Sequence, residues 1–68
     1  MRYQTYEAAV ARAETIERVR AQQRAIERIG GALAIQSTPQ SGMTLVVLTL
    51  PEPYRPDMFF PGLPFYPA

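Results

Sequence analysis

The chain has 68 residues, with seven arginines against six acidic residues and neither cysteine nor histidine. This length allows one small domain, which buries only about 60% of its unfolded surface and is marginal without a further stabilising element. Without cysteine or histidine, disulfides are excluded and transition-metal sites nearly so. We therefore expect stabilisation by a larger protein partner or by homo-oligomerisation. A net charge of +1 is too balanced to steer the chain toward nucleic acid or membrane.

Targeting signals are not predicted. Residues 1–6 are polar and no apolar segment follows them, which argues against a signal peptide. The longest apolar stretch, residues 45–50, is far shorter than the roughly 20 residues of a membrane span. The lack of cysteine fits a reducing compartment. We expect a cytoplasmic protein, or one peripheral to a cytoplasmic complex, with no membrane span.

Residues 3–29 contain no glycine or proline and are rich in alanine, glutamate, arginine and glutamine, which are good helix formers. This composition predicts one N-terminal helix of about 27 residues, ending at Gly30-Gly31. Glu14 with Arg18 and Glu17 with Arg20 have the spacing of surface ion pairs. The predicted helix has one apolar stripe with spacings of three and four, formed by Tyr6, Ala9, Ala13, Ile16, Val19, Ile26 and Ile29, with Gln23 among them.

Residues 32–36 and 43–50 predict a β-hairpin, because the turn-forming residues 37–42 separate them. Alternation in the second strand places Leu45 and Val47 on one face and Val46, Leu48 and Leu50 on the other. Both faces are apolar, and one helix covers only one of them. Since an isolated two-stranded hairpin is marginal in water, added strands or a partner are expected.

The segment 51–68 holds six of the seven prolines and five of the seven aromatic residues. Such a segment is expected to be extended and partly polyproline-like. Prolines lower the entropy lost on docking, and aromatic rings supply buried area. The sequence thus predicts an α+β chain: a helix-plus-hairpin module over residues 1–51 and a binding tail over residues 52–68. The candidate partner contacts in the tail are Tyr54, Phe59, Phe60, Leu63, Phe65 and Tyr66.

Arg20, Arg24 and Arg28 are spaced to form one stripe along the predicted helix. Three interpretations remain open: a solvated face with Glu17 and Glu27 nearby, a row of contacts to acidic residues of a partner, or a row of contacts to phosphates. We include the three arginines as secondary partner contacts. The aromatic tail has only Arg55 among its rings, which argues against nucleic acid.

Candidate catalytic chemistry is sparse. The commonest general base and the best nucleophile, histidine and cysteine, are absent. The serine and threonine hydroxyls of residues 37–42 are explained by turn preference. Gly30-Gly31 ends a helix instead of opening one and has no lysine after it, so it is not a phosphate loop. The acids on the predicted helix (Glu7, Glu14, Glu17 and Glu27) are expected at the surface, and Glu52 and Asp57 flank the tail. We predict no enzyme activity, cofactor, metal or small-molecule substrate.

Residues 27–51 carry a recognisable pattern: a helix ending in a glycine pair, a strand of the form L-x-I-x-S, a P-x-x-G turn, and a last strand closing in L-P. This pattern resembles the C-terminal end of the ATP-binding domain of sensor histidine kinases, a family shared with gyrase and the Hsp90 chaperones. The resemblance covers about a third of the chain. The matching positions are Gly30, Gly31, Leu33, Ile35, Ser37, Pro39, Gly42, Leu50 and Pro51.

This chain departs from the family mainly at the residues with which the family binds ATP and magnesium. Met43 stands where the family has threonine, and the last strand is about one residue longer. The asparagine-bearing helix and the Asp-x-Gly-x-Gly loop are missing, and Ile16, Glu17 and Arg18 replace the second glycine box. The resemblance therefore implies the edge of that fold without its ATP and magnesium residues, so that no functional residue carries over.

Together these patterns favour a non-catalytic protein-binding module, serving as a small accessory, assembly or regulatory subunit of a larger complex. Two alternatives remain. A fragment similar to the histidine-kinase ATPase domain, regulating a kinase in trans, predicts binding that depends on nucleotide. A nucleic-acid-binding peptide predicts affinity that falls steeply with added salt.

Overall fold

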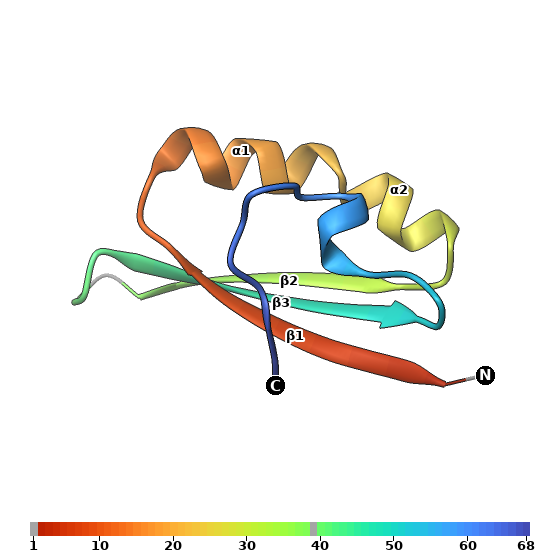
Figure 1. Ribbon diagram of the computed structural model, residues 1–68. Helices are drawn as coiled ribbons and strands as arrows, with labels where there is room; N and C mark the ends of the chain where they lie inside the picture. The colour runs from red at the N-terminus through yellow and green to blue at the C-terminus, as the bar shows by residue number, and fades with distance from the viewer. Residues whose placement is uncertain (1, 39) are drawn as a thin grey trace.

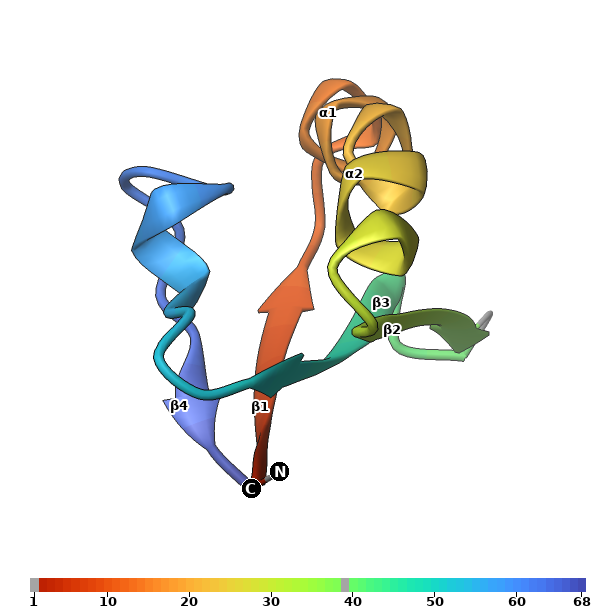
Figure 2. The same cartoon turned by 90° about the vertical axis from the view of Figure 1, so that its right-hand side faces the viewer.

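The computed structural model describes residues 2–38 and 40–68, so that Met1 and Pro39 lie outside the described residues. Four antiparallel strands form one sheet in the order β2-β3-β1-β4. A bent helix and the C-terminal segment lie side by side on the same face of this sheet (Figures 1 and 2). The strands are β1 (Tyr3–Val10), β2 (Ala32–Thr38), β3 (Met43–Pro51) and β4 (Tyr66–Pro67), and the helices are α1 (Ala13–Ala21), α2 (Gln23–Arg28) and the 3-10 turn η1 (Pro56–Met58).

The prediction of an N-terminal helix is wrong, because β1 comes first and pairs with β3 along its whole length, from Tyr3 opposite Pro51 to Val10 opposite Thr44. Ala8 and Val10 are buried while Glu7 and Ala9 are exposed, which is the period of a strand. Alanine and glutamate favour a helix in isolation, but helix propensity is weak and pairing with an open strand edge overrides it. The predicted hairpin is thus the β2-β3 part of a four-stranded sheet.

The helix begins ten residues later than predicted and bends at Gln22, between α1 and α2. Val19 and Ile26 of the predicted stripe are buried, and Ile16 and Ile29 pack beside them. The ion pair found within the described part of the chain is not one of the two predicted pairs. It joins Arg12 Nη2 to Glu14 Oε1 at 2.9 Å. Both side chains are exposed, so the pair contributes little to stability.

The predicted glycine end of the helix is confirmed. Gly30 has φ of +86°, and its N–H donates to the Glu27 carbonyl at 3.1 Å, while the Gly31 N–H donates to the Ile26 carbonyl at 2.9 Å. These two bonds form a Schellman motif. Gly31 is also held in a close approach, since a Cβ there would lie 2.6 Å from the Thr49 carbonyl oxygen. The glycine pair therefore ends the helix and lets the chain continue directly into β2, which pairs with β3.

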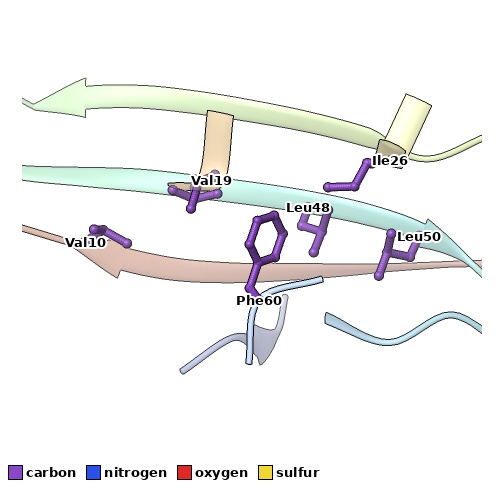
Figure 3. Packing of buried hydrophobic residues seen from close by; sticks show 7 residues of the cluster. Val10, Val19, Ile26, Leu48, Leu50 and Phe60 are labelled. Atoms are coloured by element: carbon purple, nitrogen blue, oxygen red, sulfur yellow. The ribbon is translucent and has the colours of Figure 1, made fainter. Parts of the chain in front are cut away.

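The hydrophobic core lies between the sheet and the layer of helix and tail (Figure 3). Strand β3 supplies every second residue, and one tail residue completes the cluster. The buried apolar side chains are Ala8, Val10, Val19, Ile26, Val46, Leu48, Leu50 and Phe60. Only one face of the sheet is covered in this way. Within the described residues, the helices are too short or too polar to cross a membrane.

Gly31→Ala is expected to destabilise the fold by about 1–3 kcal/mol, because the added methyl group meets backbone that cannot move aside. The free energy of unfolding from urea denaturation measures this loss. Gly30→Asn is the control, since no atom lies within 4 Å of a Cβ there and asparagine tolerates positive φ. Equal losses in both variants would contradict the close-approach explanation.

Candidate protein-binding surfaces

The C-terminal segment folds back on the chain's own sheet. It is not extended throughout, because η1 forms a turn. At its end, β4 pairs with β1 at Tyr6 and Glu7. The Gln22 side-chain amide donates to the Phe59 carbonyl at 3.3 Å, and the Ala68 N–H donates to the Thr5 carbonyl at 2.9 Å. The segment is therefore tied both to the bend in the helix and to the sheet.

The six tail residues predicted to contact a partner divide into two groups. Phe60 is only 2% exposed and belongs to the core, and Phe59, Leu63 and Phe65 pack against that core. The rings of Phe60 and Phe65 lie 5.4 Å apart, within the range of favourable aromatic pairs. Tyr54 and Tyr66 remain 37% and 68% exposed. Four of these side chains thus serve intramolecular packing, while two present substantial surface.

The three arginines predicted as secondary contacts are all exposed. Arg20 lies in α1, and Arg24 and Arg28 lie in α2 beyond the bend. None of them forms an ion pair within the described ranges, so Glu17 and Glu27 do not neutralise them by direct contact. The helix that carries these three arginines, which we call the basic stripe, lies on the covered side of the sheet (Figures 1 and 2).

No helix or other segment of the described residues covers the second face of the sheet (Figure 2). Cross-strand partners share a face, so the register defines its members. Tyr66, Glu7, Val47 and Ala34 form one row, Ala9, Leu45 and Gln36 a second, and Thr5, Thr49 and Ala32 a third. We call these ten residues the open face. Their side chains are mostly apolar or small, and Glu7 is the single charged member.

Two further exposed side chains extend the open face at opposite ends of the sheet. Tyr3 and Met43 are 54% and 37% exposed. Each lies two residues from an open-face member of its strand, so its side chain points to the same face. At its centre, Leu45 and Val47 are half-buried by their neighbours although no element covers them. The hydroxyls of Thr5 and Thr49 lie 3.3 Å apart and bond to each other across β1 and β3. The face is therefore continuous, and the exposed polar side chains among its members are Glu7 and Gln36.

Sequence reasoning placed Glu7 on a helix and so missed its position. In the structure Glu7 lies between Val47 of β3 and Tyr66 of β4 and has no ion pair within residues 2–38 and 40–68. A shallow hollow of about 280 Å³ beside it is lined by Ala9, Leu45 and Pro67 among others. The period-two pattern of Tyr6, Ala8 and Val10 is the sequence feature that indicates a strand here.

The acidic side chains do not converge. The six are all exposed, on β1 (Glu7), on the helices (Glu14, Glu17 and Glu27) and in the C-terminal segment (Glu52 and Asp57). In the described part of the chain, no three acidic side chains come together as a metal site would require. Three surface features of the described residues remain as candidates for recognising another molecule: the open face, the basic stripe and the edge of the sheet formed by β2.

Searches of protein-family models, curated proteins and solved structures found no match to this chain. The resemblance to the histidine-kinase ATP-binding domain stays a prediction. Its helix–Gly-Gly–hairpin arrangement is formed here, except that Pro39 lies outside the described residues. Any function must therefore be inferred from the chain's own surfaces.

Phe60→Ala is expected to cost about 3–5 kcal/mol, because it empties the centre of the core. A 68-residue domain has a total stability of only about 3–10 kcal/mol, so loss of cooperative thermal unfolding is the expected readout. Met58→Ala, at a position 61% exposed in the same segment, serves as the control and should unfold like the parent. A cooperative Phe60→Ala variant with unchanged stability would show that the tail does not pack as described.

Proposed function

We propose that this protein is a non-catalytic protein-binding module, an accessory or regulatory subunit that docks on a larger protein through its open face. The observation that carries the proposal is the contrast between the two faces of one sheet. One face is covered by the helix and the tail, and the other, mostly apolar or small in its side chains, is left uncovered by the described residues.

The composition of the open face supports this function. An antiparallel sheet with one solvated face ordinarily alternates apolar residues inside with polar residues outside. Strand β3 instead has Leu45 and Val47 on the outer side, with Ala9 and Tyr66 on neighbouring strands. Contiguous apolar patches on a small soluble protein mark interaction sites. Covering this patch would remove Leu45, Val47 and the exposed ring of Tyr66 from water.

The single charge on the open face specifies the partner's chemistry. Glu7 lies near the middle of β1, flanked by Val47 and Tyr66 and without an ion pair in the described ranges. Burying an unpaired carboxylate is costly, so a partner should place a cation opposite it. Two copies packed face to face would instead bring two Glu7 carboxylates together. An apolar surface with a central basic side chain, on a different protein, is the better fit.

The basic stripe and Tyr54 are secondary in this proposal. Because the helix and the sheet's open face point in opposite directions, one flat partner cannot contact both. Arg20, Arg24 and Arg28 would then meet a different acidic surface, or solvent. A net charge of +1 disfavours a nucleic-acid role. We place the module in the cytoplasm, where a chain without cysteine needs no oxidising compartment.

Regulation of a kinase in trans is a second candidate. The formed helix–Gly-Gly–hairpin supports it, since this is the part of the chain that resembles the histidine-kinase ATP-binding domain. That function requires the complex with a kinase to respond to ATP. Docking through the open face alone is indifferent to ATP, so nucleotide titration of the isolated complex separates the two.

Leu45→Arg is expected to weaken partner binding about tenfold or more, because it places a second charge in the apolar centre of the open face. Tagged full-length protein is purified from the cells that express it, and the dissociation constant of the recovered partner is measured by calorimetry. Met58→Arg adds the same charge at an exposed position away from the open face and should bind normally. A partner lost equally from both variants, or retained by both, would refute the open face.

Glu7→Lys is expected to weaken the same complex more than Glu7→Gln, since it opposes like charges where the proposal places a cation. Both variants should fold normally, because the side chain is exposed. The salt dependence of the dissociation constant should become shallower in Glu7→Gln than in the parent. Tighter binding by Glu7→Lys would mean that the partner is acidic at this point.

A further inference from the structure

The two edges of the sheet differ in how they are protected against pairing. At one edge, β4 has only two residues, and the second is Pro67, which lacks an N–H. Short edge strands and proline are two of the devices that prevent a sheet from adding further strands. Further strand pairing along β4 is therefore disfavoured.

The opposite edge has none of these devices. Strand β2 runs for seven residues, and its register against β3 is continuous from Ala32 opposite Thr49 to Thr38 opposite Met43, without a bulge. Its sequence, Ala-Leu-Ala-Ile-Gln-Ser-Thr, contains neither charge nor proline. Since β2 is the terminal strand of the sheet, alternate backbone N–H and C=O groups point outward with no strand beside them. A long, uncharged, regular edge is a template for another strand.

We propose that the β2 edges of two copies pair antiparallel across a two-fold axis and join the two sheets into one continuous sheet. A two-fold axis requires a strand to pair with itself, which is unfavourable where like charges meet. No charge exists on β2, so this pairing brings none together. Leu33 and Ile35, half-buried on the helix side of the edge, then lie against their copies. The dimer thus covers apolar surface that the monomer leaves partly exposed.

A second copy fits this edge better than a foreign strand does. Oligomerisation is one of the ways in which small domains without disulfides gain stability. The edge also differs from the open face, where Glu7 disfavours self-association. The inference goes beyond the proposed function, and a monomeric chain would overturn it without affecting docking through the open face.

The test compares two alanine-to-lysine substitutions on the same face of the sheet. Ala34 lies on the edge strand β2 and Ala9 on the interior strand β1, and both side chains are exposed. In sedimentation equilibrium, the parent should dimerise as concentration rises. Ala34→Lys should raise the dimer dissociation constant about tenfold or more, since lysines are brought together at the paired edge. Ala9→Lys should leave it unchanged.

Amide hydrogen exchange provides the second measurement. In the parent dimer, alternate amides of β2 that point outward should exchange more slowly as concentration rises, and Ala34→Lys should abolish this dependence. A parent that stays monomeric at every accessible concentration would overturn the inference. So would a dimer that Ala9→Lys dissociates as strongly as Ala34→Lys, because that pattern belongs to face-to-face packing.

Discussion

Strand β3 is the element on which the rest of the structure depends. It lies between β2 and β1, which pair with its two edges. Because its side chains are apolar on both faces, at least one face must be covered by another layer. Val46, Leu48 and Leu50 meet this requirement on one side, where the helix and Phe60 bury them. The neighbouring strands pair with the edges of β3, and the helix and the tail cover one of its faces. We expect association at the open face, which these elements leave uncovered.

The C-terminal segment takes part in that cover because the bent helix is too narrow to span the sheet. The helix lies over the β2 and β3 side, and the segment lies over the β1 and β4 side (Figure 2). Phe60 reaches between them into the core, and the Gln22 amide bonds to the Phe59 carbonyl where the helix bends. Large aromatic rings suit this role, since each buries more area than an aliphatic side chain. Proline limits the entropy lost when such a segment becomes ordered.

Local chemistry explains which parts of the fold were predictable. The hairpin and the glycine end of the helix follow from residues close together in sequence, since Gly30 supplies the positive φ that the helix end requires. Strand alternation likewise assigned Val47 and Leu48 to opposite faces, as the register has them. Residues 3–10 carry only a short period-two pattern, which their composition outweighs, because alanine and glutamate favour a helix until a distant strand edge is available.

The surface on which the tail packs was not predictable for a different physical reason, and its contact with a partner stays a prediction. An aromatic, proline-rich segment has the same composition whether it packs on its own domain or on a foreign one, so the sequence predicts its burial without specifying the surface. Phe60 is used internally, and the surfaces at which we propose association are the open face and the β2 edge. Charge separates these two surfaces: Glu7 disfavours a second copy on the open face, whereas the uncharged β2 accepts one. Pairing through the backbone edge of β2 would leave the side chains of both open faces uncovered, so the proposed dimer would present two docking faces to its partners.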